Sequence, residues 1–135
     1  MTYLLDTNAV SALMKGTPAV VDRLAAADRA EVAVPQPVIA EIAFGIERLP
    51  RSKRRAGLQA RFDLVCAEIT RAEWTDAVSQ VYGHIKAMLE RRGQRIEEFD
   101  AAIAAHALAL DATLVTANVG HMTRIPSLRV QDWSR

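Results

Sequence analysis

Short apolar runs alternate along this chain with longer stretches in which apolar residues recur every three or four positions. Runs at residues 3–5, 32–34 and 113–116 predict buried β-strands, and residues 64–69 and 128–130 are expected to hold two more. Strands that alternate with helical stretches favour an α/β domain with a mostly parallel central sheet.

The longer stretches predict the helices. The expected helices are residues 9–15, 19–27, 37–49, 51–62, one from a Thr70 cap to near Gly93, and 97–110. Thr70 and Glu73 have the spacing of a capping box. Trp74 and Tyr82 belong to the apolar stripe of the helix that follows, so we expect them in the core rather than stacked on nucleic-acid bases. In the last helix, Phe99 and Leu110 are expected on the apolar side.

The composition indicates one ordinary globular domain, residues 1–135. Half of the residues are hydrophobic, and 17 Lys and Arg balance 16 Asp and Glu to a net charge of +1. This balance does not identify a nucleic-acid binder, so that reading depends on local sites. The single cysteine, Cys66, excludes an internal disulfide and is expected to be a buried, unreactive thiol. No signal sequence and no bilayer-spanning run is visible, so we expect a cytoplasmic protein with no membrane partner.

Polar residues follow two of the predicted strands. Asp6, Thr7 and Asn8 come after the first strand, and Thr116 to Asn118 close the third. In parallel sheets, ligands bind beyond the carboxyl ends of the strands, so these clusters meet if the two strands are neighbours.

Two further acids stand near the starts of helices, beside apolar faces: Glu41 and Asp100. A carboxylate in that position needs compensation, because an unpaired buried charge is costly. It can cap a helix, pair with an arginine, or join other acids around a divalent cation. Asp6, Glu41 and Asp100 together, with Asn118, favour the cation.

Four segments of the chain resemble the PIN-domain ribonuclease toxins of the VapC type. They are Leu4-Leu5-Asp6-Thr7-Asn8, Val38-Ile39-Ala40-Glu41-Ile42, Phe99-Asp100-Ala101-Ala102-Ile103 and Leu114-Val115-Thr116-Ala117-Asn118. Each is weak alone, but their order and spacing are specific, and the similarity continues to residues 125–130. The resemblance implies a three-layer α/β/α fold, a Mg²⁺ or Mn²⁺ site, endoribonuclease activity, a homodimer and a cognate antitoxin that could form a larger complex with it.

The chemistry expected of this site is metal-assisted hydrolysis of RNA. Clustered carboxylates suit a hard cation such as Mg²⁺ or Mn²⁺, which activates water and stabilises charge on the phosphate. We expect Asp6 and Asp100 to be direct ligands, and Glu41 to be a ligand or to orient the attacking water. The hydrogen-bonding residues expected to support them are Thr7, Asn8, Thr116 and Asn118.

The last motif departs from many relatives of that type. They carry a further acid at the position of Asn118 or three residues later, where this chain has His121. Asn118 could still offer its carbonyl oxygen. One well-bound metal is therefore expected, with any second one arriving with the substrate phosphate.

Basic residues are less specific. The candidate RNA contacts are Arg51, Lys53, Arg54, Arg55 and Arg92. The alternative for the first four is a solvated helix face. Arg91 and Arg95 also lie shortly before Asp100.

Three other functions share part of this pattern. A haloacid-dehalogenase-type phosphatase needs a second Asp where this chain has Asn8, which argues against that class. A catalytically weak module that binds RNA or a partner gains support from Asn118 and His121, although the three acids argue for cleavage. A housekeeping RNA-processing nuclease is the third alternative.

Overall fold

The fold is a five-stranded parallel sheet with helices packed around it. The computed structural model describes residues 2–135. The strands are β1 (Tyr3–Leu5), β2 (Val32–Pro35), β3 (Thr70–Ala72), β4 (Thr113–Val115) and β5 (Arg129–Gln131). The helices are α1 (Thr7–Lys15), α2 (Pro18–Ala26), α3 (Gln36–Glu47), α4 (Lys53–Glu68), α5 (Asp76–Arg91), α6 (Glu98–Ala109) and α7 (Val119–Met122), and a 3-10 turn spans Arg29–Glu31.

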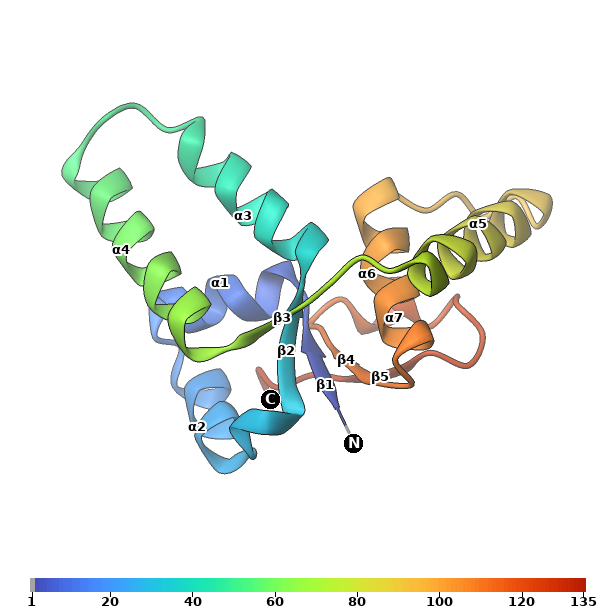
Figure 1. The fold of residues 1–135 in the computed structure, drawn as a ribbon, viewed down its shortest axis with the longest axis horizontal. Helices are drawn as coiled ribbons and strands as arrows, with labels where there is room; N and C mark the ends of the chain where they lie inside the picture. Colours follow the sequence, from blue (N-terminus) through green and yellow to red (C-terminus); the bar gives the residue numbers. More distant parts are fainter. Residues whose placement is uncertain (1) are drawn as a thin grey trace.

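The strand order is β3-β2-β1-β4-β5, and every pairing is parallel. Figure 1 shows α1, α2 and α4 to one side of the strands and α5 and α6 to the other. This arrangement confirms the α/β class with helices on both sides of the sheet. It also makes β1 and β4 neighbours, which was the condition for their polar ends to meet.

The core is aliphatic and rich in alanine. Leu4, Leu5 and Leu114 are fully buried in the central strands. Helix α6 is buried on all sides from Ala101 to Ala107, so small side chains let it pack closely against the sheet and α5. None of the described helices is long and apolar enough to cross a membrane.

The segment between α4 and α5 differs from the sequence expectation. Residues 64–69 do not form a strand, because α4 continues to Glu68. The strand in this part of the chain is β3, which begins at Thr70. Thr70 lies in β3, so it cannot cap the next helix. Thr75 does so instead, because its hydroxyl accepts a hydrogen bond from the Val78 N–H at 3.3 Å.

Several expected core residues are more exposed than their spacing suggested. Trp74 precedes α5, is 44% exposed and packs against Tyr82 and His106, so its assignment to the helical core stripe was wrong. Phe99 and Leu110 lie at the two ends of α6 and are also exposed, which corrects their placement on its apolar side. Cys66 is half-buried rather than buried, and it packs against the core from α4.

Candidate functional site

The site begins where β1 and β4 end side by side. The Asp6 N–H donates to the Val115 carbonyl at 3.0 Å, which continues the pairing of the two strands by one residue. Thr116 follows β4 and is almost fully buried, and its hydroxyl bonds the Asp6 carboxylate. The topology therefore brings the two expected polar clusters together at the carboxyl edge of the sheet.

Asp6 is buried and also caps α1. Its Oδ1 accepts the Ala9 N–H at 2.8 Å, so the capping role considered for this acid is real. Burial raises the pKa of Asp6, and the negative charge of Asp100 adds to that rise. The hydrogen bonds from Thr116 and Ala9 lower the pKa, but burial dominates.

Glu41 lies in the second turn of α3 and faces α1. The Thr7 hydroxyl donates to its Oε1 at 2.6 Å, which fixes the carboxylate. Partial burial raises the pKa of Glu41, and the charges of Glu97 and Asp100 raise it further. Thr7 therefore holds Glu41 in place, and its supporting role in a functional site stays a prediction.

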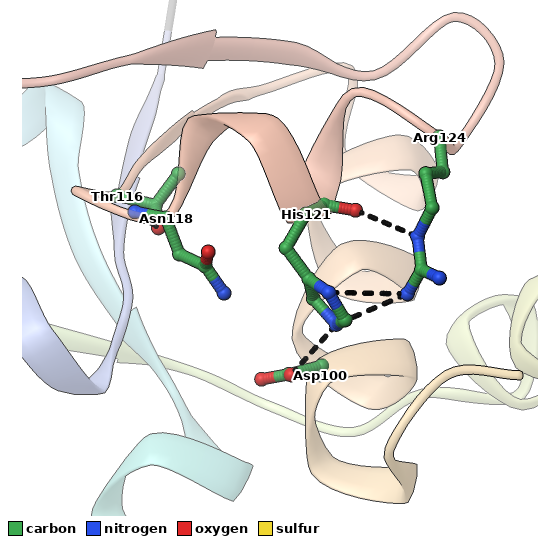
Figure 2. Close-up of polar contacts among 5 residues, drawn as sticks. All are labelled: Asp100, Thr116, Asn118, His121 and Arg124. Carbon is green, nitrogen blue, oxygen red and sulfur yellow. Dashed lines mark hydrogen bonds and ion pairs between the residues drawn. The ribbon is translucent and has the colours of Figure 1, made fainter.

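Asp100 lies in the first turn of α6, with 29% of its side chain exposed. Figure 2 shows it below His121, whose Nε2 is 3.4 Å from the Asp100 Oδ2. Burial and the charge of Glu97 raise the pKa of Asp100, whereas His121 and Arg124 lower it. Each of the three acids is thus harder to ionise than a free carboxyl group.

The two asparagines contribute differently. The backbone N–H of Asn118 donates to the Thr116 Oγ1 at 2.9 Å, which orders the turn into α7. The exposed Asn118 side chain extends from this turn on the side where Asp100 lies (Figure 2). Asn8 is exposed in the first turn of α1, and its backbone N–H hydrogen-bonds Asp6.

Two residues of the site were missed by the sequence analysis. Glu97 immediately precedes α6, and its charge reaches both Glu41 and Asp100. Glu97 stands three residues before Asp100 at the start of a helix, and residues at this spacing lie on the same side, so the sequence could have indicated that the two acids are neighbours. Arg124 interacts with Asp100 and hydrogen-bonds His121. Its spacing of three residues after His121 was a weaker signal, because it lies beyond the end of α7.

The ligand atoms of the three acids are of the kind that a hard cation prefers, but the acids lie far apart for a single ion. Asp6, Glu41 and Asp100 offer only oxygen ligands and repel one another, and a cation would relieve that repulsion. However, no three Asp, Glu, His or Cys side chains within residues 2–135 are close enough to hold one metal ion together. Mg²⁺ keeps several waters and takes only one or two carboxylates directly, so it does not require all three acids as ligands.

The candidate RNA contacts are not equivalent. Arg54 lines a cavity of about 290 Å³ that also contains Thr7 and Glu41, so it lies nearest the acids on the α4 side. The Arg55 side chain is already bound within the protein, because it forms an ion pair with Glu47 at 3.1 Å and donates a hydrogen bond to the Leu49 carbonyl. The remaining members of the set are exposed: Arg51, Lys53 and Arg92.

The PIN domain family matches residues 3–126. The chain is 31% identical to "Ribonuclease VapC2" of Rickettsia felis over the full length of both, and 28% identical to "tRNA(fMet)-specific endonuclease VapC" of Shigella flexneri over 99% of both.

Solved structures give the same result. VapBC2 from Rickettsia felis, crystallised with a DNA fragment from its promoter, has a chain that is 29% identical with a TM-score of 0.89, covering 98% of this chain and 99% of that one. VapBC-1 from Haemophilus influenzae has a chain that is 28% identical with a TM-score of 0.85, and both chains are fully covered.

Proposed function

Because this chain belongs to the PIN domain family, we propose that it is an endoribonuclease that acts as the toxin of a toxin–antitoxin pair. The observation that carries this proposal is the grouping of Asp6, Glu41 and Asp100 at one sheet edge, where each acid has a raised pKa. Acids arranged at such energetic cost are typical of functional sites. The names of the relatives support RNA as the substrate.

The proposed cofactor is Mg²⁺ or Mn²⁺, held by Asp6 and Asp100 directly and by Glu41 directly or through water. When bound, the cation would activate water and neutralise charge on the phosphate. The residues around these acids keep the ligands in place. Thr116 and the Ala9 N–H position Asp6, and Thr7 positions Glu41.

Glu41 is suited to orienting the attacking water. Its Oε1 is occupied by the Thr7 hydroxyl, while its Oε2 has no hydrogen-bond partner within residues 2–135. A raised pKa makes Glu41 a better proton acceptor than an ordinary carboxylate at neutral pH. Asn118 would add a neutral hydrogen-bonding group on the side of the site where Asp100 lies.

The proposed partners are an antitoxin protein and a second copy of this chain. Both solved relatives named above are VapBC structures, which supports the first partner. A cavity of about 300 Å³ between α1, α2 and α4 is lined mostly by apolar side chains, among them the exposed Val21 and Leu64, with charged side chains such as Arg61 beside them. An amphipathic helix from an antitoxin suits such a groove.

Expression in a bacterium tests the activity. Wild type and Asp100→Asn are induced separately, and RNA 5′ ends are sequenced before and after induction. We expect growth arrest and new, site-specific 5′ ends with wild type only. Asp111→Asn is the matched control, because Asp111 is an exposed acid bound to Arg129 outside the site. Equal numbers of new ends with wild type and Asp100→Asn would contradict the proposal.

The second candidate is an RNA-binding module that does not cleave. It is favoured by the spacing of the acids, since no three of the described metal-binding side chains converge. RNA that binds the purified protein but stays intact in Mg²⁺ and Mn²⁺ would support this alternative. Cleavage without growth arrest would point instead to a housekeeping nuclease.

A further inference from the structure

Arg124 is held beside the acidic site through His121. The Arg124 Nε donates to the His121 carbonyl at 3.1 Å, and Nη2 lies 3.1 Å from both ring nitrogens of His121. The same ring approaches Asp100, so the three side chains form a row from the acidic site outward (Figure 2). His121 therefore links an acid of the site to a permanent positive charge.

The backbone on both sides of Arg124 is anchored in the core. Met122 and Ile125 are 1% and 2% exposed, and the Ile125 N–H donates to the Met122 carbonyl at 3.1 Å. The Met122 N–H bonds the Asn118 carbonyl in turn. Arg124 thus projects from a fixed turn rather than from a mobile loop, which reduces the entropy lost when it binds a ligand.

The guanidinium group keeps unused hydrogen-bond donors. Nε and Nη2 are occupied by His121, whereas Nη1 makes no hydrogen bond and the side chain forms no close ion pair in the described part of the chain. A guanidinium has five N–H donors in a planar fork, which matches the oxygens of a phosphate. The negative charge of Asp100 attracts the Arg124 guanidinium toward the site, but no hydrogen bond to Asp100 uses these donors.

We propose that Arg124 binds a phosphate of the RNA backbone next to the bond that is cut, and that His121 positions it. This inference rests on the proposed ribonuclease activity. Asp6, Glu41, Glu97 and Asp100 make the site negative and would repel RNA. An arginine beside them offsets that repulsion, as its effect on Asp100 indicates.

The test compares wild type, Arg124→Gln, Arg124→Lys and a control, Arg129→Gln, which removes one positive charge outside the site. The substrate is a fluorophore-labelled RNA oligonucleotide copied from a mapped wild-type cleavage site. A charge-assisted contact of this kind predicts that Arg124→Gln lowers kcat/KM about 10- to 100-fold and that Arg124→Lys recovers part of the loss. Arg129→Gln should stay within about twofold of wild type.

RNA binding, measured by fluorescence anisotropy with Ca²⁺ in place of Mg²⁺, separates this role from a structural one. Loss of one phosphate contact should lower the slope of log affinity against log salt by about 0.7 in Arg124→Gln. In Arg124→Gln the Tm should not fall, and the affinity for Mn²⁺ should not weaken. His121→Ala should lose less activity, and the double variant should be no worse than Arg124→Gln, since His121 acts through Arg124.

Each outcome decides the matter. Wild-type RNA affinity and salt slope in Arg124→Gln would overturn the proposal, as would a loss explained entirely by a lower Tm or weaker Mn²⁺ binding. If wild type itself does not cut RNA, the proposed function fails, while the same binding measurement with a fluorophore-labelled single-stranded RNA of arbitrary sequence still tests Arg124 as a phosphate contact.

Discussion

Individual acids at the edge of the sheet are held in an unfavourable environment. Asp6, Glu41 and Asp100 have raised pKa values because burial and mutual repulsion penalise their charged forms. The folded protein therefore binds protons that the unfolded chain, with ordinary pKa values of about 3.9 for Asp and about 4.3 for Glu, has already released. This difference makes stability depend on pH in a direction opposite to that of salt-bridged acids.

The metal-free protein should lose stability as the pH rises through the raised pKa values. Below the unfolded values both states are protonated and the penalty is absent. Above the folded values the full penalty applies. We expect the free energy of unfolding in EDTA, measured by denaturant titration, to fall from about pH 4 upward. Asp6→Asn should flatten this fall, because Asn still caps α1 and carries no charge. An unchanged pH profile in Asp6→Asn would contradict this account of burial.

The hydroxyl of Thr7 should matter for activity through Glu41. Thr7→Val preserves shape but removes the 2.6 Å hydrogen bond, so Glu41 loses its orientation. A hydrogen bond to a charged group contributes about 1.5–3 kcal/mol, so we expect an activity loss of about 10- to 100-fold. Thr17→Val is the control, because Thr17 makes no side-chain cap bond. RNA cleavage rates at equal protein concentration measure the effect; equal rates would show that Thr7 is not needed.

Single residues differed in how well their roles could be predicted. Asp6 stands at the end of a clear strand pattern, so its meeting with the polar residues after β4 followed from the general geometry of parallel sheets. Asp100 stands beside an apolar face at a helix start, and it was a candidate only because of the pattern of the three acids together. Glu97 and Arg124 carry no such signal. Their approach to Asp100 depends on the path of the chain before α6 and after α7, which local patterns do not determine.

At the scale of elements, the cap of α5 is the sharpest disagreement between sequence and structure. Both Thr70 and Thr75 precede the helix, and Thr70 has the capping-box partner Glu73. The structure uses Thr75 because Thr70 is paired in β3 with Ala33. Tertiary pairing therefore overrode a local signal.

Alanine substitutions test this assignment. Thr75→Ala should destabilise the protein by about 1 kcal/mol, because it leaves the first turn of α5 without its side-chain cap. Thr70→Ala should cost only a few tenths of a kcal/mol, since Thr70 is exposed on the edge strand β3. Denaturant unfolding of both variants measures the difference, and the reverse ranking would favour the capping box.

The extent of α4 was also mispredicted for a physical reason. Leu64, Val65 and Cys66 form a short apolar run, and such a run does not distinguish a strand from a helix. In the structure Leu64 is 62% exposed and lines the cavity beside α2, whereas Val65 and Cys66 pack against the core from α4.

Close packing of α6 makes its alanines sensitive to size. Ala104 has no exposed surface, so Ala104→Leu should overpack the core and destabilise by about 1–3 kcal/mol. Ala87→Leu on the exposed side of α5 is the control and should be near neutral. Thermal unfolding followed by circular dichroism compares them, and similar Tm values would contradict the packing described here.

At the scale of the whole molecule, the strand order creates the site. β1 lies between β2 and β4, so the ends of β1 and β4 meet, and α3 and α6 bring Glu41 and Asp100 to the same edge. The sequence predicted the class of fold and a mostly parallel sheet. The sequence did not predict which strands are neighbours, because strand order depends on contacts between distant segments.

We propose that this acidic site cuts RNA with the help of a divalent cation. The most direct test is cleavage of purified RNA by the purified, antitoxin-free protein in Mg²⁺ or Mn²⁺, in EDTA, and with Asp6→Asn. We expect cleavage by wild type that stops in EDTA and returns with added metal, and a loss of at least about 100-fold in Asp6→Asn. Cleavage that continues at the same rate in EDTA, or with Asp6→Asn, would contradict the account.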